Sequence, residues 1–470
     1  MTGAAGILPE SWDAETDVVV VGAGACGFAA ALSAVERGAR VLLLEKWAKP
    51  GGNTALSNGF IPAAGTRLQQ AAGIEDSPEK MAADILRKNG HTADPELTLH
   101  LCRESAGLIH WLMDSVGIEL RLVTDFLYGG QSVHRFHSPP SRSGAELIAG
   151  LVQGVARQPL ITLVTATPVT ALIADETGAV LGVWAGGEPG EGEAIRAQKV
   201  ILANNGFGGN AAMVRRYCPD IAGALYFGHP GNTGDGIRWG MELGAATRHM
   251  DAFQGHGSVA YPHGLLVTWA IIEKGGFLVN SLGQRFTNEN NGYSAASVQV
   301  QAQPDGLAYV IFDARIYQDM ETHDPNFEEL VESGAVRGGP DLEALAQTLK
   351  VDGRGLAETV EQYNQAAAGG TPDPFGRADF GFAPLNPPFY GVRVRAALFH
   401  TQGGLLINRK AQPLREDGTP IPNLFCGGGV AVGISGRGCQ GYSPGNGLLT
   451  ALGWGRIAGL TAAQEISAGP

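Results

Sequence analysis

Two tyrosines and one histidine lie in segments whose residue types could do chemistry. Tyr293 lies in GQRFTNENNGYSAAS, Tyr442 in CQGYSPGNGL and His400 in FHTQGG. A phenol has an unperturbed pKa of about 10, so Tyr293 could act as a base near neutrality only with donors or positive charge close to it. The alternative is a buried tyrosine that only makes a hydrogen bond. The elements that position these residues decide between the two.

Tyr442 directly precedes GNGLLTALGWGRIAGLTAAQE, a segment that reads as a helix with free N–H groups in its first turn. Its hydroxyl group, with the backbone N–H of Gly445 or Gly447, could donate to an oxygen atom that gains negative charge during a reaction. The alternative is a tyrosine that only packs.

His400, together with Arg437 or Arg135, could recognise a carboxylate through charged hydrogen bonds. The alternative is a histidine that lines the pocket without touching the substrate. Tyr128, in DFLYGGQSVHRFH, is a weaker candidate for assisting the base.

The N-terminal segment DVVVVGAGACGFAAALSAVERGARVLLLEK has the pattern of a strand, a glycine-rich turn, a helix and a second strand that ends at Glu45. Gly22 permits a tight turn, Gly24 lets backbone N–H groups approach a pyrophosphate, and Gly27 lets helix and strand pack closely. Glu45, about 20 residues further on, can accept hydrogen bonds from a ribose. The complete unit predicts a dinucleotide site.

The composition of the chain argues against several other classes of protein, namely nucleic-acid-binding, metal-binding, secreted and membrane-spanning proteins. The chain has 470 residues, for which we expect two domains, and its formal net charge of -13 argues against a nucleic-acid partner. The five cysteines form no C-x-x-C pair, so we expect no metal site and reduced thiols.

The start lacks a secretory signal, which favours a cytoplasmic protein. The uncharged run 18–35 reaches the lower limit for a membrane span, but its glycines fall where a strand turns into a helix, so we expect no span.

A second glycine-rich segment, KPGGNTALSNG, follows the acidic residue and carries many small donors for phosphate and ribityl groups. A flexible surface loop is the alternative. The segment resembles GG-x-[ST]-x-x-[SA]-x-G of the flavoproteins typified by fumarate reductase, succinate dehydrogenase and 3-ketosteroid dehydrogenase. Further blocks similar to this family follow in order: VILANNGFGGN, NTGDGIRWGMELGAA, GGFLVNSLGQRFTNE, HTQGGLLIN and IPNLFCGGGVAVG with GNGLLTALGWGRIAG.

The resemblance implies FAD and an α/β fold, with a Rossmann-like FAD-binding domain split in sequence and an inserted α+β cap domain. We expect the FAD-binding domain at 1–248 and 394–470 and the cap at 249–393. The FAD contacts that it implies are Gly22, Gly24, Ala25, Gly27, Glu45, Lys46, Gly52, Asn53, Thr54, Ser57, Asn58, Gly59, Val169, Ala203, Gly206, Asp235, Gly428, Gly429, Gly447, Leu448 and Leu449.

Two departures from the family concern the flavin. Covalently flavinylated members carry a histidine just before the threonine of the early loop, and this chain has Asn53 there, so we expect non-covalent FAD. The usual acidic residue of A-G-E is replaced by Gly429, which affects one ribityl contact.

Position 293 separates two branches of the family. In fumarate reductases an arginine four residues beyond the glutamate of R-F-x-N-E delivers a proton, and this chain has Tyr293 there. In 3-ketosteroid 1-dehydrogenases the pattern N-E-x-x-P-Y places a tyrosine base at this position, and N-E-N-N-G-Y matches its spacing without the proline. Tyr442 is similar to the tyrosine of G-Y-x-S-G in 3-ketosteroid 4-dehydrogenases, whereas His400 matches the histidine that binds a carboxylate in fumarate reductases.

We therefore expect FAD-dependent α,β-dehydrogenation of a cyclic ketone, either a 3-ketosteroid or a smaller ring ketone or keto acid. Tyr293 would take the proton, Tyr442 would clamp the carbonyl, and hydride would pass to flavin N5. The alternatives are an ene-reductase of an unsaturated carboxylate, anchored by His400 and an arginine, and a flavin electron carrier without its own substrate. Without a haem or cluster motif, the electrons must leave to an external acceptor such as oxygen or a quinone.

Overall fold

The computed structural model describes residues 8–324 and 326–468. The chain forms two compact units: unit 1 comprises Met1–Cys218, Gly228–Phe253 and His400–Pro470, and unit 2 comprises Pro219–Phe227 and Gln254–Phe399. The segment Pro219–Phe227, which we expected in the FAD-binding domain, belongs to unit 2, because its short strand β10 (Leu225–Tyr226) pairs with β16 (Phe389–Thr401).

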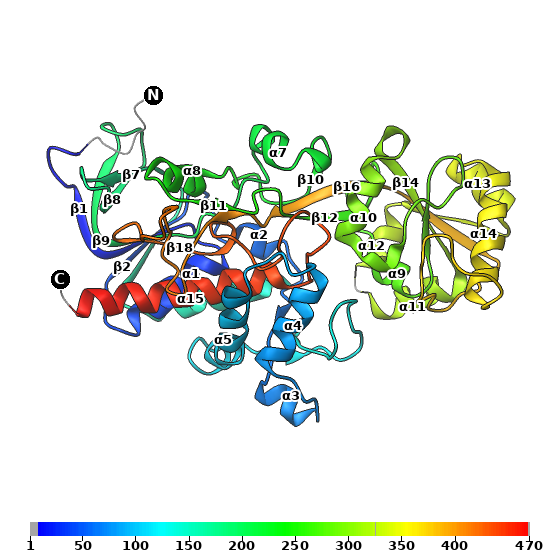
Figure 1. Cartoon of the computed structure of the whole chain (residues 1–470), viewed down its shortest axis with the longest axis horizontal. Helices are drawn as coiled ribbons and strands as arrows, with labels where there is room; N and C mark the ends of the chain where they lie inside the picture. The colour runs from blue at the N-terminus through cyan, green and yellow to red at the C-terminus, as the bar shows by residue number, and fades with distance from the viewer. Residues whose placement is uncertain (1–7, 325, 469–470) are drawn as a thin grey trace. The chain divides into compact units, whose positions relative to one another are not determined.

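A largely parallel sheet forms the centre of unit 1, in the order β6-β2-β1-β9-β8-β7, with β18 also paired to β9 (Figure 1). The run Val18–Val21 lies on its buried central strand, parallel to both neighbours. The strands are β1 (Ala14–Val21), β2 (Val41–Leu44), β6 (Ile161–Val164), β7 (Val169–Ala174), β8 (Val180–Ala185), β9 (Glu193–Leu202) and β18 (Leu424–Cys426).

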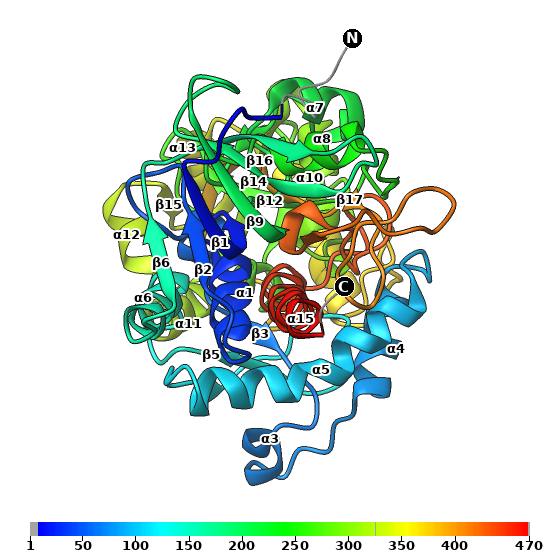
Figure 2. The ribbon, with the colours of Figure 1, turned by 90° about the vertical axis from the view of Figure 1, so that its left-hand side faces the viewer.

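Two helices of unit 1, α1 (Ala25–Val35) and α15 (Asn446–Ser467), pack against each other at backbone distance. A Cβ atom on Gly455 would lie 2.3 Å from the carbonyl oxygen of Cys26, and one on Gly459 would lie 2.2 Å from that of Ala30. Figure 2 shows α15 nearly end-on with α1 beside it. Among the described residues, no helix is long and apolar enough to cross a membrane.

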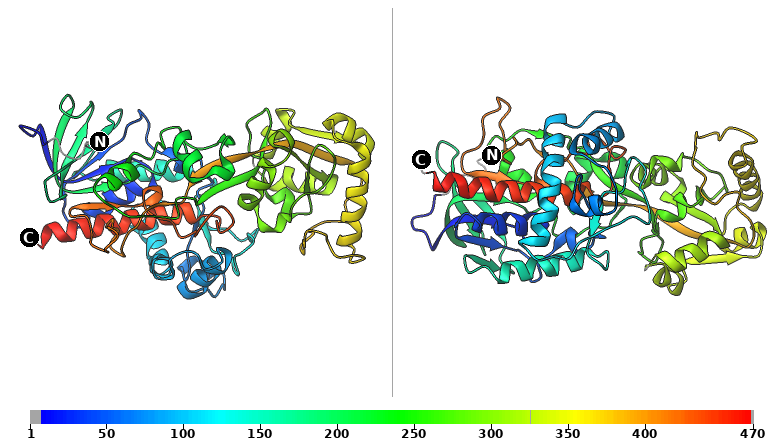
Figure 3. Two further views of the ribbon diagram at one scale, coloured as in Figure 1. Left: turned by 45° about the horizontal axis from the view of Figure 1, so that its top comes forward. Right: turned by 90° about the horizontal axis from the view of Figure 1, so that it is seen from below.

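The long helix α5 (Pro95–Asp114) lies across α15, where a Cβ atom on Gly453 would come 2.4 Å from Leu101 (Figure 3, right). Its N-cap is Asp94, which accepts from two backbone N–H groups of the first turn. The other helices and short strands of unit 1 are α2 (Gly52–Ala55), α3 (Arg67–Ala71), α4 (Pro78–Lys88), α6 (Gly144–Ala156), α7 (Ala211–Tyr217), α8 (Asp235–Glu242), η4 (Gly428–Val430), β3 (Ile61–Pro62), β4 (Arg121–Leu122), β5 (Phe136–Ser138), β11 (Thr247–Arg248) and β17 (Gly404–Leu405).

Unit 2 combines a sheet in the order β10-β16-β14-β13, in which β12 and β15 also pair with β16, with several helices. The segment GLAYVIFDARIYQD forms a strand and then a helix rather than a turn, because Asp313 caps the N–H groups of Arg315 and Ile316. The other elements of unit 2, besides β10 and β16, are β12 (Phe253–Ala260), β13 (Phe277–Val279), β14 (Leu307–Asp313), β15 (Val336–Gly339), α9 (Ala270–Glu273), α10 (Tyr293–Gln301), α11 (Ala314–His323), α12 (Phe327–Glu332), α13 (Leu342–Leu349), α14 (Gly353–Ala367), η1 (Pro219–Ile221), η2 (Glu289–Asn291) and η3 (Pro304–Gly306).

Candidate active site

The glycine-rich turn between β1 and α1 has the shape of a phosphate cradle. Gly22 has φ +100°, and a Cβ atom there would lie 2.8 Å from the carbonyl oxygen of Ala203. A Cβ atom on Gly27 would lie 1.8 Å from the carbonyl oxygen of Gly22, whereas one on Gly24 would meet nothing closer than 3.8 Å. Gly24 is also the N-cap of α1 and has no side chain to satisfy its first-turn N–H groups. The open backbone at Gly24 therefore fits a pyrophosphate.

Glu45 directly follows β2 and binds to the turn between β1 and α1. Its carboxylate oxygens accept from the backbone N–H of Ala23 at 2.8 Å and of Trp47 at 2.9 Å. A carboxylate oxygen accepts more than one hydrogen bond, so the group can still take a ribose hydroxyl. Lys46 places its ammonium 3.6 Å from the carboxylate of Asp235, so these two predicted contact residues are paired with each other.

The early loop is a short helix, α2, held to the segment after residue 228. Asn53 Oδ1 accepts from the backbone N–H of His229 at 2.6 Å and from Asn232 Nδ2 at 2.8 Å. Asn53 therefore fixes the loop through its carboxamide. Ser57 turns back onto the carbonyl oxygen of Thr54 at 2.8 Å and accepts from the N–H of Gly59 at 3.2 Å, which orders the rest of the segment.

Asn205, the second of the two unusual asparagines of A-N-N-G-F, accounts for the glycine at 429. A Cβ atom on Gly429 would lie 2.2 Å from Asn205 Oδ1, which itself accepts from the N–H of Gly206 at 2.8 Å. The carboxamide of Asn205 thus occupies the space that a side chain at 429 would need. The neighbouring Asn204 Oδ1 is buried without a hydrogen-bond partner in the protein. This unpaired acceptor and the open glycine cradle both fit FAD.

Tyr442 and His400 both lie close to Gly447, in the first turn of α15. A Cβ atom on Gly447 would lie 3.0 Å from His400 Nε2 and 3.8 Å from the Tyr442 oxygen. The two rings meet edge to face, with centroids 5.6 Å apart. The backbone groups of Gly447 and Gly445 hydrogen-bond to the phenol. These backbone groups orient the phenol in this structure, and their contact with a ketone oxygen stays a prediction.

Both side chains are uncharged at neutral pH. Burial raises the pKa of Tyr442 far above its ordinary value, so its hydroxyl group remains a donor. Burial also lowers the pKa of His400 to about 4, so the imidazole is neutral. The start of α15 therefore offers neutral hydrogen-bond donors.

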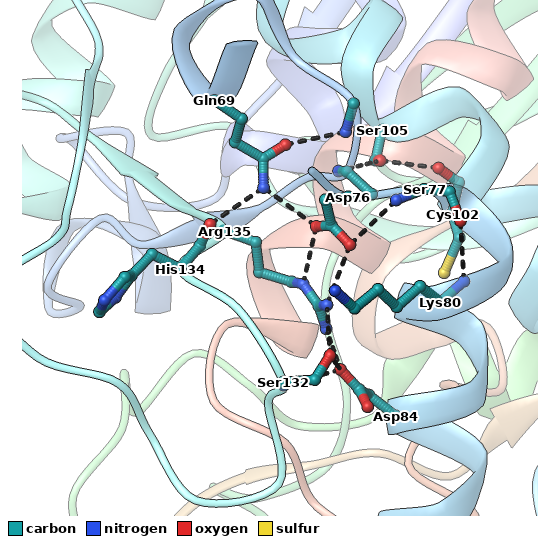
Figure 4. Close-up of polar contacts among 12 residues, drawn as sticks. Gln69, Asp76, Ser77, Lys80, Asp84, Cys102, Ser105, Ser132, His134 and Arg135 are labelled. Carbon is teal, nitrogen blue, oxygen red and sulfur yellow. Dashed lines mark hydrogen bonds and ion pairs between the residues drawn. The ribbon is translucent and has the colours of Figure 1, made fainter. Parts of the chain in front are cut away.

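The expectation that Arg135 recognises a carboxylate is wrong. Its side chain is 1% exposed and pairs with Asp76 at 3.1 Å and Asp84 at 2.8 Å (Figure 4). Ser132 and Gln69 complete the network, which joins α4 to the segment that leads into β5. Two carboxylates thus neutralise Arg135 inside the protein, where it has a structural role.

Arg437 has an exposed side chain and faces Asp251, with Nε 3.3 Å from the carboxylate. Its guanidinium therefore has a counter-ion within unit 1.

Tyr128 belongs to a group of aromatic side chains that adjoins the start of α15. It contacts Phe126 and Phe136, with ring centroids 5.0 and 5.5 Å away, and Phe136 stacks on Phe60 at 5.4 Å. A Cβ atom on Gly445 would lie 3.1 Å from the Phe136 ring. These rings form an apolar surface next to the donors of α15.

In unit 2, Tyr293 is the first residue of α10 and follows Gly292, which has φ +94°. Side chains in a helix lean toward its N-terminus, so the phenol extends beyond the first turn, where the helix dipole is positive. The ring stacks on His256 with centroids 4.7 Å apart. Burial lowers the pKa of His256 to about 3, so this neighbour supplies no positive charge.

The loop before Tyr293 is held by a buried ionic cluster. Glu289 is fully buried and accepts from Arg285 at 2.7 Å, from Arg377 at 3.4 Å and from the backbone N–H of Leu278 at 3.2 Å. Arg285 also binds Asp373. The motif around Arg285 and Glu289 therefore fixes the entry into α10 to β13 and to the segment before β16.

Two residues of interest, Glu273 and Gln402, are not predicted from the sequence. Glu273, at the end of α9, is a carboxyl group whose pKa burial raises to about 7. Nothing in its sequence surroundings signals this, because the burial comes from distant segments. Gln402 contacts His400 and could have been found, since residues two apart at the end of a strand face the same side.

Comparisons with known proteins agree with this arrangement. The family model described as FAD binding domain matches residues 17–448. The fumarate reductase (cytochrome) of Shewanella frigidimarina is 33% identical over 450 residues, which cover 95% of this chain and 77% of that protein. The NADH:fumarate oxidoreductase of Klebsiella pneumoniae (strain 342) is 33% identical over 452 residues, and the chain spans only 48% of its length.

A solved structure extends the comparison to ketone enzymes. The 3-ketosteroid-delta4-(5alpha)-dehydrogenase of Rhodococcus jostii RHA1, in complex with 4-androstene-3,17-dione, has a TM-score of 0.78 at 30% identity and covers 97% of this chain and 98% of its own. Fold and cradle thus define an FAD-dependent oxidoreductase that acts on CH–CH groups. The chain belongs to the FAD-binding family of the fumarate reductase and succinate dehydrogenase flavoproteins, so the resemblance expected from the sequence is confirmed.

Proposed function

We propose that the protein desaturates a cyclic ketone to the α,β-unsaturated ketone. The observation that carries this proposal is that the two side-chain donors beside Gly447, those of Tyr442 and His400, are both neutral. Neutral donors can hydrogen-bond to a ketone oxygen and stabilise the charge that develops on it, whereas a carboxylate is bound best by cations.

Each residue has a defined task in this reaction. Tyr293 takes the proton from the carbon next to the carbonyl group, and Tyr442 donates to the ketone oxygen as enolate charge develops there. The aromatic group around Tyr128 provides an apolar surface for a ring. When bound, FAD supplies the acceptor for the hydride that leaves the β-carbon. The electrons then leave to an external acceptor.

The second candidate function is reduction of an unsaturated carboxylate. It is favoured by the fumarate reductase of Shewanella frigidimarina, which is 33% identical to this chain. Such a reaction needs a proton donor at the position of Tyr293, and a phenol with an ordinary pKa of about 10 can donate as well as accept. Redox assays in both directions separate the two functions.

Anaerobic mixing of the oxidised holoenzyme with cyclohexanone, a 3-ketosteroid or succinate tests the proposal. We expect one of the saturated ketones to bleach the flavin absorbance. Tyr293→Phe should slow this bleaching by about 10²- to 10⁴-fold, the range for loss of a general base, with little change in ketone affinity.

Tyr261→Phe is the matched control, because Tyr261 is an exposed tyrosine of the same unit. Rapid reoxidation of the reduced enzyme by fumarate, with no response to any saturated ketone, would establish the second candidate instead. No response to any of these compounds would indicate an electron carrier.

A further inference from the structure

Four parallel strands of unit 1 end in register along one edge of its sheet, in the order β2, β1, β9 and β18. Their last paired residues are Leu44, Val21, Leu202 and Cys426. The loops after these strands therefore follow one another along this edge. An edge of this kind, at the carboxyl ends of parallel strands, is where open α/β sheets bind their ligands.

FAD is a linear molecule, so its parts should meet these loops in the order of its bonds. Glu45 follows β2 and can take the adenosine ribose, and the open backbone at Gly24, after β1, fits the pyrophosphate. The next part of FAD is the ribityl chain, which carries a row of hydroxyl groups. By the order of the strands, the loops after β9 and β18 come next, and they contain Asn205 and Gly429.

The carboxamide of Asn205 is oriented by its own loop. The residue has φ +65°, a left-handed conformation that asparagine adopts more readily than most other residues with a side chain. Its Oδ1 accepts from the backbone N–H of Gly206 at 2.8 Å, and a Cβ atom on Gly429 would lie 2.2 Å from this oxygen. Because the N–H of Gly206 needs an acceptor, the oxygen is the atom turned toward it, and Nδ2 lies at the other end of the amide.

The Nδ2 group of Asn205 has no hydrogen-bond partner in the part of the chain that the structure describes. An amide nitrogen carries two donor protons. The side chain is half-buried, and a donor that is partly shielded from water gains free energy from an acceptor close to it. A ribityl hydroxyl oxygen is an acceptor of the required kind.

We propose that Asn205 donates a hydrogen bond from Nδ2 to a ribityl hydroxyl group of FAD. This neutral contact takes the place of the acidic side chain that the family pattern has at position 429. The two departures are linked, because a side chain at 429 and the carboxamide of Asn205 cannot share the same space. The inference rests on FAD as the cofactor and not on the proposed reaction.

Binding of FAD analogues to the apoprotein tests the contact without any turnover. The analogues 2′-deoxy-, 3′-deoxy- and 4′-deoxy-FAD each lack one ribityl hydroxyl group, and titration calorimetry measures their dissociation constants. We expect one analogue to bind the wild type about three- to tenfold more weakly than FAD, the effect of one hydrogen bond between neutral groups. Asn205→Gly, which keeps the left-handed backbone, should bind this analogue as tightly as FAD.

Three results would overturn the proposal. In the first, Asn205→Gly still discriminates against every analogue that the wild type binds weakly. In the second, the wild type binds all three analogues as tightly as FAD. In the third, Asn205→Gly loses affinity equally for FAD and for the analogues, which would show that Asn205 only orders its loop.

Asn423→Gly is the matched control. Asn423 also has a left-handed backbone, with φ +63°, but it precedes β18 at the opposite end of that strand. Its side chain accepts from Lys199 and donates to the carbonyl oxygen of Val180. We expect the melting temperature of this variant to fall, while its preference among the FAD analogues stays that of the wild type. A changed preference would attribute the effect to loop conformation and count against the contact.

A measurement on the wild-type protein does not depend on the folding of Asn205→Gly. In protein labelled with ¹⁵N-asparagine, the side-chain amide signal of Asn205 is the one missing from Asn205→Asp. We expect one of its protons to resonate further downfield in the FAD complex than in the complex with the weakly bound analogue. Equal shifts in the two complexes would contradict the hydrogen bond.

Discussion

Glu273 shows how burial changes the chemistry of one residue. Its carboxyl group has an ordinary pKa of 4.5, which burial raises to about 7, while the nearby Lys274 acts in the opposite direction. Between these two values the folded protein holds a proton that the unfolded chain releases. The contribution of this group to stability is therefore fully present below pH 4.5 and is lost as the pH rises through 7.

Glu273→Gln should remove this dependence. We expect the wild-type free energy of unfolding to fall by roughly 2 kcal/mol more than that of the variant between pH 5 and pH 8. Urea unfolding at both values measures the difference. Glu329→Gln, at an exposed position, should leave the wild-type dependence unchanged. If the free energy of unfolding changes equally with pH in Glu273→Gln and in the wild type, the carboxyl group is ionised in the folded protein.

At the scale of elements, helix α10 depends on the ionic cluster that precedes it. The carboxylate of Glu289 forms ion pairs with the two buried arginines Arg285 and Arg377 and so offsets part of their positive charge. Gly292 has the positive φ at which the chain turns into the helix. Because Tyr293 is the first residue of α10, the position of its phenol follows from this loop.

Glu289→Gln should destabilise unit 2 by about 3–5 kcal/mol, because it leaves buried guanidinium charge without its partner. Chemical unfolding measures the loss, and hydrogen exchange should be fastest in the first turn of α10. Glu332→Gln, an exposed substitution at the end of α12, serves as the control. A loss below about 1 kcal/mol would show that Asp373 alone balances the cluster.

At the scale of the whole molecule, the residues expected to contact FAD come from three separate stretches of the sequence and all lie in unit 1. The parallel sheet and the packing of α1 on α15 bring the stretches together. Unit 2 carries Tyr293 and its supporting cluster. Cofactor binding and the proposed base thus belong to different folding units.

FAD should therefore stabilise unit 1 more than unit 2. At a free FAD concentration about 100-fold above its dissociation constant, the gain is about 2.7 kcal/mol. Calorimetry of the apoprotein and holoprotein should show a rise in the melting temperature of the unit 1 transition. Because position 53 is asparagine, denaturation should release all of the flavin. Flavin fluorescence that stays with the denatured chain would contradict the non-covalent assignment.

The local elements of the FAD-binding unit could be predicted from the sequence. The strand ending at Val21, the glycine turn and the cap at Asp94 depend on neighbours in the chain, and each follows from residue type and spacing. The family resemblance was equally accessible, since its motifs are continuous segments. The expected role of Arg135 was wrong because its two carboxylate partners come from other segments.

The strand-turn-helix unit, the family and the tyrosine at position 293 can be read from the sequence, because these properties are local. The burial that keeps His400 neutral, the contact of Gln402 with His400 and the position of Asn205 beside Gly429 become visible in the folded protein. Burial and hydrogen-bond direction depend on groups far apart in the chain, and the folded backbone alone brings those groups together.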